Sequence, residues 1–383
     1  MTSTCRLDDV CELVMGQAPS GEAYNTDGKG WPLIAGAGDF GESTPQSTKF
    51  TTVATKLSRA GDIVLAIRAS IGERVVADGE YCLGRGVAGL RPLETLNSRF
   101  LWHWLSHISP QLTLKAKGAT FKQVNKQDIG ELPMSLPPMA EQQRIAEVLD
   151  RAEALRAKRR AALAQLDALG QSIFLDLFGD PATNPKGWEM LHLQDVLSMP
   201  LRNGLSPSHV GKIMAKVLTL SAITGSGFDD SAWKVSTFRS TPPSDQSVDE
   251  NDFLICRGNG NVRLVGKGYF PPRRMPDITF PDTMIAARVK TDRLERVFLQ
   301  HIWGRNAVRR QIESLARTTN GTFKVNQTML EGITFIGPPL QLQREFARRV
   351  GTADKLKADQ RTSLAELDAL FAVLQHRAFR GEL

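Results

Sequence analysis

The chain has 383 residues, of which 41% are hydrophobic and 23% charged, and its formal net charge is +7. This length suits two domains of moderate size, and no apolar stretch approaches the roughly 20 residues that a membrane-spanning helix needs. The N-terminus lacks the basic-then-apolar order of a secretory signal, and the cysteines Cys5, Cys11, Cys82 and Cys256 show no CxxC spacing. We therefore expect a cytoplasmic protein without a membrane segment.

The positive charge is concentrated in the second half of the chain. Residues 1–180 contain 20 basic and 21 acidic side chains, whereas residues 181–383 contain 28 and 20. Within residues 251–320 the numbers are 13 and 6. Such a basic surface favours a polyanionic partner, nucleic acid first, because Lys and Arg neutralise phosphates. On charge alone, an ordinary solvated surface explains it equally well.

Two stretches of the chain, residues 1–138 and 181–339, have the sequence pattern of mixed globular domains. Short β-branched runs bounded by Gly, Pro or Asp predict strands, as in GDIVLAI (61–67), KVLTLSAIT (216–224) and TMIAARVK (283–290). Helical patches interrupt them at residues 98–108 and 295–316. We predict two α/β domains with many Gly-rich loops, where recognition residues commonly lie.

A long helix follows each predicted domain. From residue 145 the seam positions are separated alternately by three and four residues, and the same pattern recurs 201 residues later. A sustained period near 3.5 predicts a coiled coil, in which each helix finds its partner in the other. The apolar seam residues are Ile145, Val148, Leu155, Leu166, Leu169 and Ile173 in the first helix, and Phe346, Leu356, Leu367, Leu370 and Leu374 in the second.

Polar residues occupy the same central step of both seams. Arg159 in the first helix corresponds to Gln360 in the second. A polar group at such a position fixes the register of a coiled coil at some cost in stability. Alternatively, both side chains merely extend their polar ends to solvent.

The repeat covers more than the helices. VNKQDIGELPMSLPP (124–138) corresponds to VNQTMLEGITFIGPP (325–339), and GDIVLAIR (61–68) to NDFLICR (251–257). The Pro-Pro pairs end the domain chain, because a residue before proline avoids the helical conformation. The predicted order is a domain at 1–138, a helix at 139–180, a domain at 181–339 and a helix at 340–383.

Catalytic motifs are not evident. GAGDFG (36–41) fits the dinucleotide pattern GxGxxG, but the following ESTPQST cannot open the helix that would hold a pyrophosphate. His103 and His107 have the spacing of two metal ligands, yet no third ligand is evident, and the repeat has Arg305 in place of His107. Neither a nuclease ExK nor the Asp/Asn-Pro-Pro-aromatic motif of amino-group methyltransferases occurs. We expect no catalytic residue, no metal site and no cofactor of the chain's own.

This organisation resembles the DNA specificity subunit of type I restriction-modification systems. The resemblance rests on two unlike domains that are each followed by a helix with a shared phrase, on the junction LPPMAEQQRIAEVLD (136–150) and on its sequel FGDPATNPKGWEMLHLQDV (178–196). The second junction, PPLQLQREFARRV (338–350), lacks the glutamate of the first. The resemblance covers nearly the whole chain.

The resemblance implies an α/β (α+β) protein with two target-recognition domains separated by two long antiparallel helices that form a coiled-coil spacer. Each domain would read one half of an asymmetric, bipartite target in double-stranded DNA. The helices would set the spacing and bind two modification (methyltransferase) subunits, and a restriction subunit would complete the complex. S-adenosylmethionine, ATP and Mg²⁺ are then expected on these partners and not on this chain.

Candidate DNA-binding residues lie in two kinds of loop. Those in the repeated basic loops LKAKGATFKQ (114–123) and ARTTNGTFK (316–324) suit phosphates, because they recur in domains that should read different sequences. They are Lys115, Lys117, Thr120, Lys122, Arg317, Thr319 and Lys324. Base readers are expected in the non-repeating loops IRASIG (67–72) and CRGNGNVR (256–263), namely Arg68, Ser70, Arg257, Asn259 and Arg263. Ordinary turn chemistry is the alternative for these Gly- and Asn-rich loops.

Two other functions remain open from the sequence. One is a stand-alone nuclease or methyltransferase, against which the lack of catalytic motifs argues. The other is a scaffold or adaptor that uses the coiled coil for protein partners and does not bind DNA.

Overall fold

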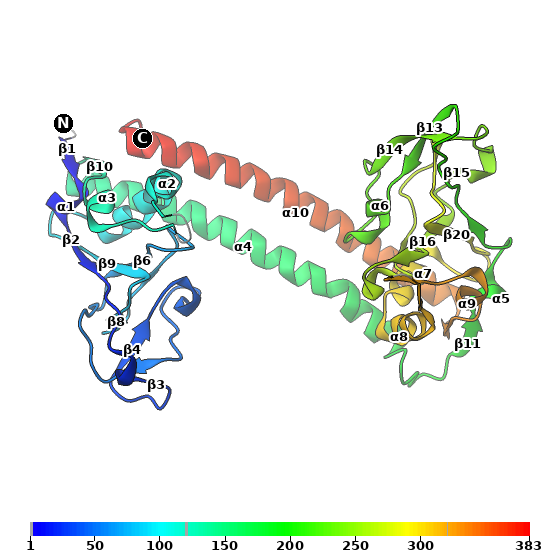
Figure 1. The fold of residues 1–383 in the computed structure, drawn as a ribbon, viewed down its shortest axis with the longest axis horizontal. Helices are drawn as coiled ribbons and strands as arrows, with labels where there is room; N and C mark the ends of the chain where they lie inside the picture. Colours follow the sequence, from blue (N-terminus) through cyan, green and yellow to red (C-terminus); the bar gives the residue numbers. More distant parts are fainter. Residues whose placement is uncertain (1–2, 119–121, 320) are drawn as a thin grey trace. The chain divides into compact units, whose positions relative to one another are not determined.

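The computed structural model describes residues 3–118, 122–319 and 321–383 (Figure 1). The chain divides into an N-terminal unit, Met1–Ala162 with Gln360–Leu383, and a C-terminal unit, Leu163–Asp359. Each unit thus combines a globular part with portions of two long helices, α4 (Met139–Phe178) and α10 (Leu340–Arg380). The division falls inside these helices, whereas the predicted domain boundaries lie at their ends, and those boundaries stay a prediction.

The N-terminal unit is built around an antiparallel sheet with the order β2-β9-β6-β7. Its strands are β2 (Cys11–Met15), β9 (Val87–Pro92), β6 (Ile63–Ala66) and β7 (Arg74–Val76). A smaller sheet contains β3 (Tyr24–Asn25), β5 (Phe50–Thr51), β4 (Trp31–Ile34) and β8 (Cys82–Leu83), and β1 (Ser3–Arg6) pairs with β10 (Pro133–Leu136). The short helices are α1 (Leu7–Val10), α2 (Ser98–Lys115) and α3 (Lys126–Gly130).

The C-terminal unit contains a sheet of the corresponding order, β12-β20-β16-β18. Its strands are β12 (Arg202–Asn203), β20 (Met284–Arg288), β16 (Asp252–Cys256) and β18 (Gly268–Tyr269). A second sheet has the order β14 (Trp233–Phe238), β13 (Ile213–Leu218), β19 (Met275–Thr279) and β15 (Ser247–Val248). A third has the order β17 (Gly258–Asn259), β22 (Thr322–Lys324) and β21 (Arg317–Thr319), and β11 (Glu189–His192) pairs with β23 (Thr334–Gly337). The short helices are α5 (Leu193–Val196), α6 (Ser221–Thr224), α7 (Arg296–Trp303), α8 (Asn306–Leu315) and α9 (Gln327–Glu331).

The predicted mixture of helices and strands is confirmed. Among the described residues, no helix is both long enough and apolar enough to cross a membrane.

Both long helices contribute to the hydrophobic core of each unit. In the N-terminal unit, Ile145 and Leu149 of α4 share a buried cluster with Phe371 and Ala378 of α10. In the C-terminal unit, Phe174 and Phe178 of α4 pack with Phe346 of α10 and Phe298 of α7, with ring centroids 5.0 to 5.9 Å apart. Each fully buried Phe contributes about 1.5 to 3 kcal/mol, so the cores hold the helix ends firmly.

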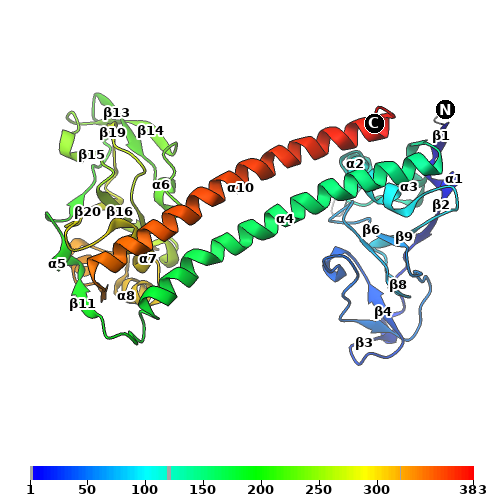
Figure 2. The same cartoon turned by 180° about the vertical axis from the view of Figure 1, so that it is seen from behind.

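Ion pairs and a hydrogen bond show that the two helices run antiparallel within each unit. In the N-terminal unit, Arg144 Nη2 donates to Leu383 O at 2.7 Å and Arg156 Nε lies 2.6 Å from Asp368 Oδ1. In the C-terminal unit, Asp167 lies 3.4 Å from Lys357, and Asp176 lies 3.9 Å from Arg349. As residue numbers rise along α4, the partner numbers fall along α10. Figure 2 shows each of the two as one uninterrupted helix.

Four of the eleven predicted apolar seam residues are displaced by one position. The side chains of four predicted seam residues are exposed, by 52% for Leu155, 38% for Leu169, 45% for Leu356 and 51% for Leu370. The residues that follow them, Arg156, Gly170, Lys357 and Phe371, are half-buried or buried instead. At Leu155 and Leu356 the prediction was wrong because it gave leucine preference over Arg156 and Lys357, whose long side chains cover apolar surface and carry ion pairs. Among the other seam residues, Ile145 and Phe346 are buried, and Val148, Leu166, Ile173, Leu367 and Leu374 are half-buried.

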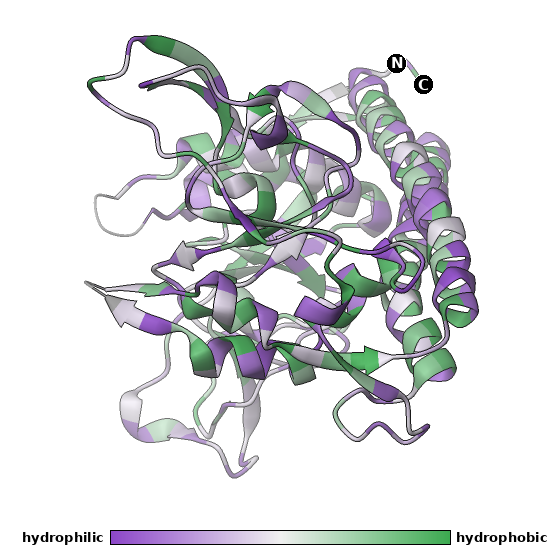
Figure 3. Ribbon diagram, turned by 90° about the vertical axis from the view of Figure 1, so that its right-hand side faces the viewer, coloured by the Kyte–Doolittle hydropathy of each residue, from purple (hydrophilic) through white to green (hydrophobic). Residues whose placement is uncertain are grey.

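The polar residues at the centre of the two seams connect the helices by a hydrogen bond. Arg159 Nη1 donates to Gln360 Oε1 at 2.5 Å, and both side chains are half-buried. Of the two sequence interpretations, the structure therefore supports a specific polar pair over two side chains that separately reach solvent. The long helices carry both hydrophilic and hydrophobic residues (Figure 3).

Candidate nucleic-acid interface

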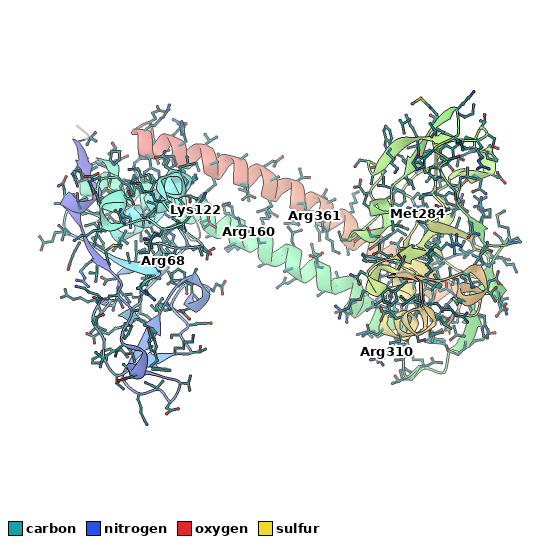
Figure 4. The ribbon with its side chains drawn as sticks, viewed as in Figure 1. Arg68, Lys122, Arg160, Met284, Arg310 and Arg361 are labelled. Atoms are coloured by element: carbon teal, nitrogen blue, oxygen red, sulfur yellow. The ribbon has the colours of Figure 1, made fainter. Side chains whose placement is uncertain are left out.

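The structure brings the two kinds of candidate loop together in the N-terminal unit. Gln123 forms β-bridges with both Arg68, in the loop after β6, and Lys117, in the segment after α2. The amide N and carbonyl O of Lys117 and Gln123 exchange two hydrogen bonds of 3.0 Å. Residues that are some 50 positions apart in the sequence thus share one surface, on which Figure 4 labels Arg68 and Lys122.

The C-terminal unit joins its candidate loops in the same way. Strand β22 pairs with β17, so that Lys324 lies opposite Gly258, and also with β21, so that Lys324 lies opposite Arg317. Asn259 lies opposite Phe323 in this small sheet. Backbone pairing therefore places the predicted phosphate-binding residues beside the predicted base readers in each unit.

The basic side chains on these surfaces lack acidic partners. Among the described residues, none of the candidate lysines and arginines forms an ion pair with a carboxylate, and unpaired cations remain available to phosphates. The exposed ones are Lys115, Lys117, Lys122, Arg263, Arg317 and Lys324, while Arg68, Ser70, Arg257 and Asn259 are half-buried. Thr120 lies outside the described residues, and Thr319 is the last residue of β21.

The register settles one correspondence that the sequence repeat leaves open. GDIVLAIR (61–68) is one residue longer than NDFLICR (251–257), and the backbone hydrogen bonds place Arg257 at the position of Ile67. The amide of Ile67 donates to Gly86 O at 2.9 Å, and that of Arg257 donates to Thr283 O at 2.8 Å. The Arg257 guanidinium donates to Asp282 O at 3.2 Å, so it braces a neighbouring loop. Residue type alone does not detect a one-residue shift of a strand.

Turn chemistry accounts for part of the loop that follows Arg257. The side-chain oxygen of Asn259 accepts a hydrogen bond from the amide of Asn261 at 2.9 Å. The side chain of Asn261 in turn accepts from the amide of Arg263 at 3.0 Å. The Asn259 amide group and the exposed Arg263 guanidinium are the parts that can contact a ligand.

Each unit has a cleft beside these loops. The cleft of the N-terminal unit has a volume of about 430 Å³, and its lining includes Gly36, Gly38, Arg68, Ser70 and Arg85. The Gly-rich GAGDFG segment thus helps to form a cleft wall. Ala69, at the same cleft, has a φ of 55°, a left-handed conformation that costs a non-glycine residue free energy and is common at functional sites.

The cleft of the C-terminal unit is smaller, about 280 Å³. It is lined by Arg257, Gly258, Asp282, Thr283, Thr322 and Lys324. Arg85 and Asp282 were not among the predicted residues. A charged residue just ahead of a buried strand, flanked by glycines in the case of Arg85, is the sequence signal that would have found them.

The two histidines with metal-ligand spacing take part in packing. His103 is buried with its Nε2 2.7 Å from Asp150 Oδ1. The ring of His107 lies 5.2 Å from that of Phe379 of α10. These contacts connect α2 to both long helices within the N-terminal unit.

Comparisons with known proteins all find similarity to specificity domains or subunits of type I restriction-modification systems. Residues 2–165 match the family model described as the type I restriction modification DNA specificity domain. The MjaX type I restriction enzyme specificity subunit of Methanocaldococcus jannaschii is 31% identical over 163 residues, 42% of this chain and 38% of its own length. The EcoKI specificity subunit of Escherichia coli K12 is 25% identical over 327 residues, 80% of this chain and 68% of its own.

A solved structure is similar in fold over the full chain. The crystal structure of the type I restriction-modification S subunit from M. genitalium superposes with a TM-score of 0.59 at 16% identity, and the match covers 99% of this chain and 96% of that one. At this identity the likeness shows the fold alone.

Proposed function

From the match of residues 2–165 to the type I restriction modification DNA specificity domain, and from the similarity to specificity subunits, we propose that the chain is the non-catalytic subunit that supplies a type I restriction-modification complex with its DNA sequence specificity. The observation that carries this proposal is the occurrence, in both units and at corresponding places of one shared framework, of basic loops whose described lysines and arginines form no ion pair with a carboxylate. Two such surfaces on one chain suit a bipartite target, and their different residues suit an asymmetric one.

The contacts divide into two classes under this proposal. Lys115, Lys117 and Lys122 of one unit, and Arg317 and Lys324 of the other, bind phosphates and position the duplex. The cleft loops, which differ between the units, contact base edges. Residues 1–138 and 181–339 are then the two target-recognition domains.

The long helices form the coiled-coil spacer of the proposed subunit. With 40 and 41 residues, at about 1.5 Å per residue, each measures roughly 60 Å. Their ends are anchored in the unit cores, and their exposed faces are available to two modification subunits. S-adenosylmethionine, ATP and Mg²⁺ belong to the partner subunits, one of which is a restriction subunit.

A salt titration tests DNA binding. The full chain, co-purified with a modification subunit, is titrated with duplex DNA at 50 and 200 mM salt. If it contacts six to ten phosphates, the affinity falls by roughly 10³- to 10⁵-fold between these conditions. A scaffold that does not bind DNA would show no shift at either salt concentration.

A second measurement tests specificity. Methylated adenines are mapped by sequencing host DNA with and without this gene. The expected result is a two-part motif that disappears with the gene. Methyl transfer by the purified chain alone would instead identify a stand-alone methyltransferase and contradict the proposal.

A further inference from the structure

The two clefts occupy corresponding places in one backbone framework. In the N-terminal unit Val87 lies opposite Ala66, and in the C-terminal unit Met284 lies opposite Cys256. The amide of Val87 donates to Gly84 O at 3.2 Å, and that of Met284 donates to Pro281 O at 2.9 Å. Counting from these pairs, Arg85 and Asp282 hold the same position, two residues before the strand.

The same kind of close contact fixes the backbone at this position in both units. The amide of Gly16 donates to Val87 O at 3.0 Å, and the amide of Gly204 donates to Met284 O at 3.1 Å. A Cβ atom on Gly16 would lie 2.1 Å from Gly84 O, and one on Gly204 would lie 2.1 Å from Pro281 O. Such backbone-to-backbone contact leaves no room for a side chain, so the segment that carries Arg85 or Asp282 is held in place.

The side chains at this fixed position are chemically opposite. Arg85 is exposed between two buried glycines, lines its cleft beside Arg68 and Ser70, and forms no ion pair among the described residues. Asp282 is half-buried in its cleft, and its Oδ2 accepts a hydrogen bond from Ser206 Oγ at 2.7 Å. That bond orients the carboxylate and leaves Oδ1 available to a ligand.

The carboxylate of Asp282 lies on a surface that otherwise carries the basic residues Lys324, Arg317 and Arg263. Hydrogen bonding to a DNA base explains why an acidic residue is found there. A carboxylate repels phosphates, so at a DNA interface it is favourable where it accepts a hydrogen bond from a base amino group, such as N4 of cytosine. An arginine is the converse, because its two donors match O6 and N7 of guanine.

We propose that this position is a specificity-determining residue in each unit, with Arg85 reading a guanine of one half-site and Asp282 reading a cytosine of the other. The inference rests on the proposed function and extends it, because it names the residue pair that makes the half-sites differ. The shared framework delivers the side chain to the base edge, and the charge of the side chain selects the base.

Selection from a randomised duplex pool tests the assignment. The full chain in complex with its modification subunit is compared with Arg85→Gln and Asp282→Asn, since Gln and Asn match adenine in the major groove. Arg85→Gln should change one guanine of one half-site to adenine, and Asp282→Asn should change one cytosine of the other half-site to adenine. The preference at the affected base pair should change by about 5- to 150-fold, and the rest of the motif should stay.

Matched variants control for charge and folding. Arg59→Gln and Asp277→Asn remove the same charges at exposed positions of the same units, and the motif should not change. Arg85→Ala and Asp282→Ala should relax the preference at the same base pairs, which keeps the test valid if an amide variant does not fold.

The outcomes separate the two levels of inference. A wild-type complex that enriches no motif contradicts the proposed function itself. A wild-type motif that both amide variants retain overturns only the assignment of Arg85 and Asp282. Weaker binding with an unchanged preference has the same meaning, because it identifies a phosphate contact.

Discussion

Two buried glutamines hold the starts of the long helices. Gln142 is 1% exposed, its Oε1 accepts from the amide of Asn97 at 2.8 Å, and its Nε2 donates to Thr95 O and Pro137 O at 2.9 Å. Gln343, 201 positions later, makes the corresponding contacts with Glu295 N at 2.9 Å and Pro338 O at 2.7 Å. The glutamate that the second junction lacks is therefore not part of this anchor.

Replacing Gln142 by Met should destabilise the N-terminal unit by about 2 to 4 kcal/mol, because buried backbone groups would lose their partners while the volume stays similar. Urea unfolding measures the change. Gln143→Met is the control, since Gln143 is exposed and should tolerate the substitution. Equal effects of both variants would mean that the glutamine contacts contribute little.

His301 makes the stability of the C-terminal unit depend on pH. Burial, with help from Arg305, lowers the pKa of His301 to about 4, although Asp354 opposes the shift. An unfolded histidine titrates near 6.5. As pH falls from 6.5 towards 4, the unfolded chain therefore binds a proton that the folded unit does not, and stability decreases.

The variant His301→Asn removes this proton linkage. At pH 7.5 it should be less stable than the wild type, because the packing of the ring on Phe346 is lost. Its disadvantage should shrink by about 2 kcal/mol at pH 4.5. Urea titrations at both pH values measure the difference, and a constant gap would show that His301 titrates normally in the folded unit.

At the scale of elements, Arg156 connects α4 to α10 in the N-terminal unit. Its guanidinium lies 4.3 Å from the ring centroid of Phe371, and its Nε lies 2.6 Å from Asp368 Oδ1. Arginine combines stacking with a directed ion pair, which a lysine at this step does not reproduce.

Both Arg156→Ala and Arg156→Lys should loosen the C-terminal portion of α10. The expected cost is about 1 to 2 kcal/mol, because the pair is partly exposed to solvent. Hydrogen exchange of residues 360–380 should become faster in both variants. Arg151→Ala, at an 80% exposed side chain on the same helix, should leave the exchange unchanged. Rescue by lysine would show that charge alone matters.

At the scale of the whole molecule, the proposed division of labour predicts the behaviour of a chimera. Replacing residues 1–138 by the matching domain of a related subunit should change one half-site of the target and leave the other unchanged. The exchanged domain must still pack on Ile145, Leu149 and Phe371, which stay with the helices.

Mapping methylated adenines in cells that carry the chimera measures the outcome. A mismatched base pair costs about 1 to 3 kcal/mol, so the old and new half-sites should be clearly distinguished. A chimera that assembles but changes both half-sites would mean that the domains do not read DNA separately.

The sequence alone determined the features that are local or repeated along the chain. The 201-residue repeat, the two long helices, the mixed domains and the resemblance to specificity subunits, whose domain model matches residues 2–165, all followed from it. Periodicity and repeated segments are patterns along the sequence, so they can be detected without knowledge of the contacts. The basic loops were also found in this way, since composition and repeat position sufficed.

Only the tertiary structure decided which side chains meet. A 3.5-residue period leaves the choice between Leu155 and Arg156 open, and the partner Phe371 with Asp368 resolves it in favour of arginine. Likewise, a strand can shift by one residue without changing its composition, so the correspondence of Arg257 with Ile67 needed the backbone hydrogen bonds to Thr283 and Gly86, just before β20 and β9. Arg85 and Asp282 became comparable for the same physical reason: long-range backbone pairing, and not residue identity, sets equivalent positions in the two units.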